Sequence, residues 1–201
     1  MGNILVYFRY INFYIIHMET IAIVILLVLG LIAIFVINLN NTLVKMKQTI
    51  NEATADIETF LKQRYDLIPN LVETVKGYAK HEKDLFENVT KLRTEAMNAK
   101  STDEKLKLDK QLQDNITKIF AVAENYPELK ANENFLNLQA NLKDMEEEIQ
   151  KARRFYNGTV RDFNTKIQVF PNNIFAKMLG FSEFPFFEAS EEEKQNVQVK
   201  F

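Results

Sequence analysis

The segment that comes closest to a catalytic motif is His81-Glu82-Lys83-Asp84-Leu85. A helical zinc protease needs the pattern H-E-x-x-H, because two histidines one turn apart bind the metal and the glutamate acts as general base. Leu85 stands where the second histidine would be, and the only other histidine of the chain is His17. Cysteine is absent. We therefore expect no zinc chemistry at this segment.

Other kinds of site also lack their ligands in this sequence. A di-metal carboxylate bundle needs Glu-x-x-His pairs that face inward, and none occurs. A glycine-rich phosphate loop is missing as well. The formal net charge of −2, without a polybasic stripe, argues against a nucleic-acid interface. We expect a protein that is not an enzyme, with no cofactor, no metal, no small-molecule substrate and no nucleic-acid partner.

Several polar residues lie where helices are expected to begin, end or meet. In one interpretation they cap helices or pair with neighbouring helices. The capping candidates are Asp66, Asn70 and Glu73 on the second helix, and Lys130, Asn132 and Asn134 on the fourth. In the other they form a polar patch that binds a partner. The members of that candidate patch are Arg64, Asp66, Asn70, Arg153, Arg154 and Asn157. The patch requires the first and last helices to lie close together, which the spacing alone does not establish.

The elements that carry these residues are long amphipathic helices, because apolar positions recur at alternating steps of three and four. The first stripe consists of Leu43, Met46, Ile50, Ala53, Ile57, Phe60 and Arg64, and it continues from Leu67 to Ala96. Pro69 barely interrupts it. A turn at 66–69 and a single helix kinked there both fit. We favour the turn, because a residue that precedes proline disfavours the helical region.

Two further helices follow. Ser101-Thr102-Asp103 offers N-cap side chains, and the apolar stripe after it ends near Asn125-Tyr126-Pro127. The last stripe runs from Phe135 to Ile167 opposite a face of Lys, Glu, Gln and Asn. The expected fold class is all-α: an N-terminal single transmembrane helix, then an elongated antiparallel four-helix bundle with long helices over residues 40–170. An intermolecular coiled coil also fits the stripes.

The transmembrane helix is expected at residues 21–39, Ile21 to Leu39, where 19 residues carry no charge. At helical rise they cover roughly the ~30 Å of a bilayer's hydrocarbon core. Positive flanks tend to stay in the cytoplasm, and after this stretch come Lys45 and Lys47, with Lys62 and Arg64 further on. The bundle is therefore expected inside the cell. Residues 1–20 are expected to form a short flank outside the cytoplasm. Translation could start at Met1 or at Met18.

The C-terminal part is apolar and then acidic. Residues 171–188 include the phenylalanine-rich string Gly180 to Phe187, which we expect to fold back onto the bundle, since exposing it to water would be unfavourable. A membrane-surface or partner contact is the alternative for this segment. Residues 189–201 are expected to form an acidic flexible tail.

Several ordered motifs resemble the bacterial LemA family. They are Arg64-Tyr65-Asp66-Leu67-Ile68-Pro69-Asn70-Leu71-Val72, Val75-Lys76-Gly77-Tyr78-Ala79-Lys80-His81-Glu82, Ala123-Glu124-Asn125-Tyr126-Pro127-Glu128-Leu129-Lys130-Ala131-Asn132 and Ala152-Arg153-Arg154-Phe155-Tyr156-Asn157, with Phe163-Asn164 and Phe170-Pro171 after them. One departure is Gln63, where the family often has a second arginine; another is the aromatic N-terminal extension. The resemblance implies a single-pass protein of the bacterial cytoplasmic membrane with a helical bundle inside. It implies no established activity.

The expected function is that of a non-enzymatic scaffold or adaptor, held at the membrane by residues 21–39 and binding a protein partner or a second copy of itself. Tethering raises the effective concentration of partners near the membrane. The alternative is a self-assembling envelope protein that organises or remodels membrane, with its phenylalanine-rich end against lipid.

Overall fold

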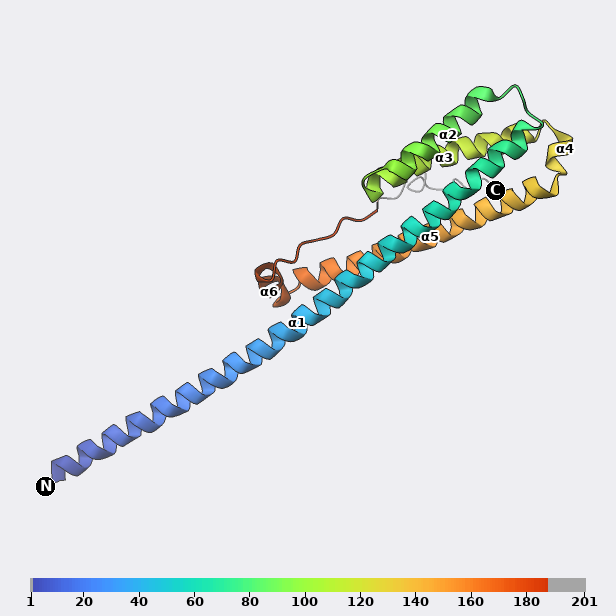
Figure 1. Ribbon diagram of the computed structural model, residues 1–201. Coiled ribbons are helices and arrows are strands. Elements are labelled where there is room, and N and C mark those ends of the chain that lie inside the picture. The colour runs from blue at the N-terminus through green and yellow to red at the C-terminus, as the bar shows by residue number, and fades with distance from the viewer. Residues whose placement is uncertain (1, 188–201) are drawn as a thin grey trace, which may run out of the picture. The chain divides into compact units, whose positions relative to one another are not determined.

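The structure is a computed structural model that describes the backbone of residues 2–187 and the side chains of residues 17–102 and 104–187. Within this range the regular elements are helices (Figure 1). Their bounds are α1 Gly2–Lys76, α2 Lys83–Asn98, α3 Thr102–Ala123, α4 Pro127–Lys130, α5 Glu133–Gln168 and α6 Asn172–Met178. The all-α expectation is confirmed. The N-terminal flank's side chains and the acidic tail expected at 189–201 lie outside this description.

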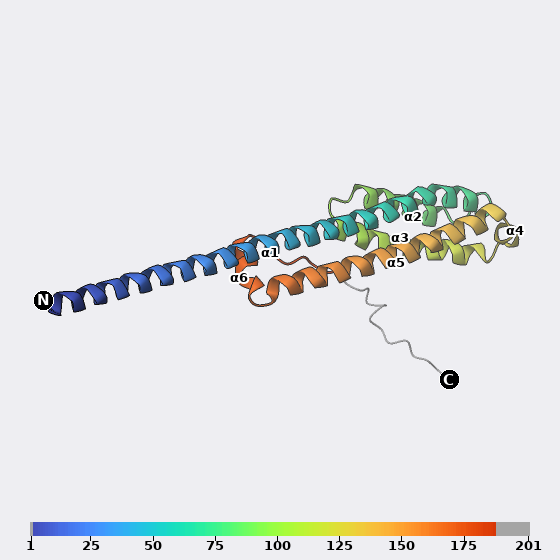
Figure 2. The same ribbon diagram turned by 90° about the horizontal axis from the view of Figure 1, so that it is seen from below.

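The described residues form two compact units. The bundle unit comprises residues 48–162 and 184–187, and the N-terminal unit comprises residues 2–47 and 163–183. In the bundle unit α1 leads into α2, α2 into α3, and α3 through α4 into α5, with neighbouring helices antiparallel (Figures 1 and 2). The antiparallel bundle expected from the stripes is therefore confirmed.

The core of the bundle unit follows the apolar stripes. A stripe at steps of three and four keeps one face of a helix turned toward its neighbours, and burial of that face stabilises the bundle by roughly 25 cal/mol per Å². Stripe residues with almost no exposed surface include Ile50, Ile57, Leu71, Val75, Val89, Leu112, Ile116, Ile119, Phe135, Ile149 and Val160. Tyr78, which also belongs to the expected stripe, is exposed because α1 has ended before it.

The helix boundary expected at residues 66–69 is wrong. α1 continues through Pro69 to Lys76, and the chain turns at Gly77 instead. Proline has no N–H to donate to the carbonyl four residues earlier, which here belongs to Tyr65. The Nε atom of Arg93 on α2 donates to that carbonyl oxygen at 2.6 Å. The tertiary contact replaces the missing helical bond, so the helix need not end.

Because α1 has no end near Pro69, the capping role expected there is also wrong. Asp66 pairs with Lys62 at 2.9 Å, and Glu73 pairs with Lys76 at 3.1 Å, both along the surface of α1. The carbonyl of Asn70 accepts a hydrogen bond from the Thr74 hydroxyl at 2.7 Å, as in any helix interior.

Two other helices, α3 and α5, begin with the N-caps that the sequence predicts. The Ser101 hydroxyl accepts from the Glu104 N–H at 3.2 Å, so the cap expected for α3 is confirmed. Asn132 Oδ1 accepts from the Phe135 N–H at 3.1 Å and caps α5. Lys130 instead pairs with Glu124.

The N-terminal unit contains the apolar part of α1, the last turns of α5, and α6. α6 lies beside α1 in both views of this unit (Figures 1 and 2). Leu39, Leu43, Phe163, Ile167 and Ala176 are buried there. The side chains of residues 17–38 are predominantly exposed, and this helix is long and apolar enough to cross a membrane.

Candidate functional site

A buried cluster of charged residues joins three helices of the bundle unit. Arg64 on α1 is only 1% exposed. Its Nη1 atom lies 3.0 Å from Asp109 Oδ2 on α3 and 2.8 Å from Glu146 Oε2 on α5. Gln150 Nε2, one turn further along α5, donates to Glu146 Oε1 at 3.0 Å. One guanidinium thus links positions far apart in the sequence.

Two carboxyl groups, those of Asp109 and Glu146, face the single guanidinium of Arg64. Burial raises the pKa of Asp109 from 3.8 to about 6; Arg64 opposes that shift and Glu146 adds to it. Arg153 on α5 also lowers the pKa of Asp109, so this second arginine lies within electrostatic reach. The cluster therefore holds a carboxyl group whose pKa lies above its ordinary range.

Tyr65 completes the cluster. Burial raises the pKa of its hydroxyl, and the charge of Asp109 raises it further. A hydrogen bond between the two groups contributes to both shifts: it raises the pKa of Tyr65 and lowers that of Asp109. Nε and Nη2 of Arg64 are buried without a hydrogen-bond partner among the described residues. A buried polar atom without a partner is unfavourable by about 1–3 kcal/mol.

This arrangement suits helix pairing better than catalysis. A general acid or base must reach a substrate, and Asp109 is only 6% exposed within the bundle core. Among the side chains that the structure describes, no group of three His, Cys, Asp or Glu residues is placed to hold a metal ion. We interpret the cluster as a specific contact that aligns α1, α3 and α5.

The residues of the candidate patch occupy different environments. Arg64 is in the core, and Arg153 is half-buried near Asp109, so these two meet in the cluster. Asp66 pairs with Lys62 on the surface of α1, and Asn157 binds the backbone of Phe187. Asn70 and Arg154 are exposed. The proximity of α1 and α5 that the patch requires is present, but Arg64 is not available at the surface.

Asp109, Glu146 and Tyr65 were not anticipated from the sequence. A signal did exist, since Arg64 occupies an apolar stripe position. Asp109 precedes Leu112 by three residues and therefore extends the α3 stripe. A charge on a core stripe needs a buried counter-charge, and that reasoning could have paired the two residues.

Asn157 holds the end of the phenylalanine-rich segment on the bundle. Its Nδ2 donates to the Phe187 carbonyl at 2.9 Å, and its Oδ1 accepts from the Phe187 N–H at 2.9 Å. The neighbouring Tyr156 hydroxyl donates to the Pro185 carbonyl at 3.0 Å, and its ring lies 4.2 Å from that of Phe187. Phe187 is buried by these contacts.

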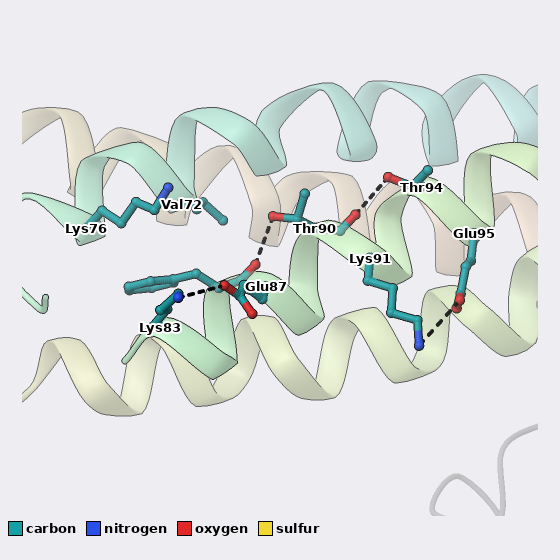
Figure 3. Close-up of a pocket in the computed structure, with 9 residues that line it drawn as sticks. Val72, Lys76, Lys83, Glu87, Thr90, Lys91, Thr94 and Glu95 are labelled. Atoms are coloured by element: carbon teal, nitrogen blue, oxygen red, sulfur yellow. Dashed lines mark hydrogen bonds and ion pairs between the residues drawn. The ribbon is translucent and has the colours of Figure 1, made fainter. Parts of the chain in front are cut away.

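An open groove lies between α1 and α2 (Figure 3). It is lined by Val72, Lys76, Lys83, Phe86, Glu87, Thr90, Lys91, Thr94 and Glu95. Its lysines already face carboxylates: Lys83 lies 3.6 Å from Glu87 and Lys91 lies 3.8 Å from Glu95. The Thr90 and Thr94 hydroxyls donate to carbonyls of their own helix. The groove therefore presents no activated nucleophile.

Together these features define a class: an all-helical bundle protein with one helix long and apolar enough to cross a membrane. The sequence pattern of the LemA family matches residues 53–201. The chain belongs to the LemA family.

Similarity to individual proteins agrees with this assignment. Protein LemA of Metamycoplasma hominis is 25% identical over 175 residues, which cover 87% of this chain and 80% of that protein. Magnetosome protein MamQ 2 of Paramagnetospirillum magneticum is 24% identical over 174 residues, which cover 74% of this chain and 64% of that protein. Magnetosome protein MamQ of Magnetospirillum gryphiswaldense is 21% identical, with 73% and 64% covered. The aligned region thus spans just under two thirds of the MamQ proteins, and none of these names is that of an enzyme.

Proposed function

We propose that this protein is a membrane-anchored helical scaffold or adaptor of the bacterial cytoplasmic membrane. The observation that carries the proposal is the apolar stretch of α1, whose large side chains from Ile21 to Phe35 are exposed in the described structure. Leaving a large apolar side chain in water rather than burying it is unfavourable by about 1.5–3 kcal/mol. A lipid bilayer provides the missing apolar environment along the whole stretch.

The same helix supplies both the anchor and one helix of the bundle, since α1 is continuous from Gly2 to Lys76. Lys45 and Lys47 follow the apolar stretch, which favours a cytoplasmic bundle and an N-terminus outside. The bundle then presents long polar helix faces to cytoplasmic proteins close to the membrane. Tethering raises their effective concentration there.

Orientation can be tested directly because the chain contains no cysteine. A Glu147→Cys variant places one thiol on the exposed face of α5. A membrane-impermeant maleimide should label it only after the cells are lysed. Labelling of intact spheroplasts would place the bundle outside the cytoplasm and contradict this part of the proposal.

The adaptor role is tested by photo-crosslinking in intact cells. A photo-reactive residue at Glu147 should repeatedly capture one particular heterologous protein, and deletion of residues 21–39 should reduce that capture strongly. Lys118, exposed on α3, serves as the control position because it samples a different helix face. Failure to capture a heterologous protein from either position would contradict the adaptor role.

A self-assembling envelope protein that organises membrane is the second candidate. Apolar side chains exposed around α6 favour it, since such a patch marks an interaction site. The similarity to magnetosome proteins is compatible with it. Capture of this protein alone in the photo-crosslinking experiment would support this candidate over the adaptor.

A further inference from the structure

The surface of the N-terminal unit carries a second apolar patch besides the anchor. Its members surround α6 and are Val169, Phe170, Ile174, Met178 and Leu179. Phe170 is 80% exposed and Met178 is 77% exposed. Single exposed apolar residues are ordinary, but a group of five on one short segment needs a partner.

The opposite side of α6 is already occupied. Asn172 and Ala176 are buried, and Asn172 Nδ2 donates to the Lys166 carbonyl at 3.0 Å. The helix ends in a Schellman motif, in which Gly180 N–H donates to the Lys177 carbonyl at 3.2 Å and Phe181 N–H donates to the Ala176 carbonyl at 3.0 Å. α6 is therefore fixed in the unit by one face, which leaves the apolar patch on the other.

The position of α6 along α1 indicates what covers the patch. The ring of Phe175 on α6 packs against that of Phe35 on α1, with centroids 5.7 Å apart in an edge-to-face arrangement. Phe35 precedes Leu39, the end of the apolar stretch, by about one helical turn, or roughly 6 Å along the axis. α6 therefore lies at the level where the apolar stretch ends.

The charges near α6 fit a membrane surface. Lys177 lies on α6, Lys166 lies in the last turn of α5, and Lys45 and Lys47 lie on α1 after the apolar stretch. Lysine side chains can extend to phosphate groups while their stems cover apolar surface. Interfacial helices combine such lysines with Phe and Leu side chains.

We infer that α6, with the residues on either side of it, is an interfacial helix that inserts its apolar patch into the bilayer leaflet on the Lys45 side of the anchor. This inference rests on the membrane anchor of the proposed function. The contact of Phe175 with Phe35 sets the depth of α6 in the membrane. The patch extends the apolar surface of the anchor sideways along the membrane. The protein thereby contacts lipid at two places.

The test uses the full chain in vesicles of zwitterionic and anionic phospholipids with brominated acyl chains, which quench tryptophan. The sequence contains no tryptophan, so a single substitution reports one position. Phe170→Trp and Met178→Trp probe the patch without disturbing the core, because both side chains are exposed. Leu29→Trp probes the middle of the anchor, and Phe155→Trp, exposed on α5 of the bundle unit, is the matched control. Circular dichroism verifies that each variant keeps its helicity.

We expect bromines at shallow acyl positions to quench Phe170→Trp and Met178→Trp severalfold more than Phe155→Trp, with emission shifted to the blue. Deep bromines should quench Leu29→Trp most. If Leu29→Trp is quenched but the patch variants behave like Phe155→Trp, the anchor stands and the interfacial helix is refuted. A blue shift of the patch variants without quenching means that protein, such as a second copy, covers the patch, and also refutes it. Without quenching of Leu29→Trp, the anchor fails and both proposals fall together.

Discussion

Arg93 donates a hydrogen bond from Nε to the backbone carbonyl of Tyr65 at 2.6 Å, and this carbonyl is the one that Pro69 leaves without its helical N–H. A proline in a helix interior is unfavourable by ~3 kcal/mol, partly because that carbonyl loses its partner. A side chain from α2 thus supports the backbone of α1. The contact also ties α2 to α1.

This relationship predicts coupling between Arg93 and Pro69. Arg93→Ala should destabilise the protein by about 1–3 kcal/mol, because the Tyr65 carbonyl becomes unsatisfied. In a Pro69→Ala background the alanine N–H can bond to that carbonyl, so the same Arg93→Ala change should have a smaller effect. Thermal unfolding of the full-length protein in detergent, followed by circular dichroism, measures all four variants of the cycle. Equal effects of Arg93→Ala in both backgrounds would show that its role is unrelated to the proline.

The buried cluster predicts a large effect at Arg64. Arg64→Leu leaves Asp109 and Glu146 facing each other without the guanidinium and should destabilise the protein by about 3–5 kcal/mol. Lys62→Ala on the same helix removes an exposed pair with Asp66 and should change stability by at most about 1 kcal/mol. The same unfolding measurement compares them. Similar losses for the two variants would contradict a special role for the buried pair.

The pKa of Asp109 predicts a pH dependence of stability. Burial raises that pKa from 3.8 to about 6 in the folded protein, so between these values the folded state binds a proton more readily than the unfolded state. The free energy of unfolding should therefore fall as the pH rises from about 4 to about 6, by up to about 3 kcal/mol, and then stay level. Asp109→Asn should remove this component. A wild-type minus variant difference that does not change over this pH range would refute the assignment.

The two hydrogen bonds of Asn157 are expected to hold residues 184–187 on α5. Asn157→Leu removes both hydrogen bonds to the Phe187 backbone, so the segment should detach and chymotrypsin should cleave after its phenylalanines sooner. Arg154→Leu is the control, because that exposed residue lies on the same helix and the change leaves the phenylalanines of the segment in place. Limited proteolysis followed by mass spectrometry locates the cuts. Unchanged cleavage in Asn157→Leu would mean that ring packing on Tyr156 alone retains the segment.

Two glycines predict opposite effects of the same substitution. Gly158 lies inside α5 with open space at its Cβ position, so Gly158→Ala should stabilise the helix by about 0.5–1 kcal/mol. Gly180 has φ +79°, so Gly180→Ala should destabilise the end of α6 by about 1–2 kcal/mol. Thermal unfolding should shift upward for the first variant, and hydrogen exchange should increase in α6 for the second. A stabilising Gly180→Ala would refute the Schellman end of α6.

Much of the fold could be predicted because helix periodicity is local. The apolar stripes located many core residues of the bundle, although Phe60 and Leu67 are half-buried and their neighbours Leu61 and Ile68 are buried instead. Ser101 marked the start of α3 through a bond to a residue only three positions away. The apolar stretch of α1 was visible as an uncharged run long enough to cross a membrane. The Pro69 boundary was mispredicted because the partner that rescues the Tyr65 carbonyl lies 28 residues further along the chain.

The candidate site could be predicted only in part. Arg64 was recognised as a member of both a core stripe and a polar patch, but these two roles exclude each other, and the structure places it in the core. Arg153, grouped with it in the candidate patch, lowers the pKa of Asp109. Asn157 was assigned to a partner surface, whereas it binds the backbone of Phe187 30 residues away.

The sequence by itself thus determined the helical class, the apolar stretch long enough to cross a membrane, and much of the faces that the helices bury, because spacing within one helix is set by its 3.6-residue period. Only the tertiary structure decided which charged residues meet. Arg64 reaches Asp109 across 45 positions and Glu146 across 82, and no local rule relates such residues. Whether a polar atom is capped, paired or left for solvent depends on which helix packs beside it, and that is a property of the assembled bundle.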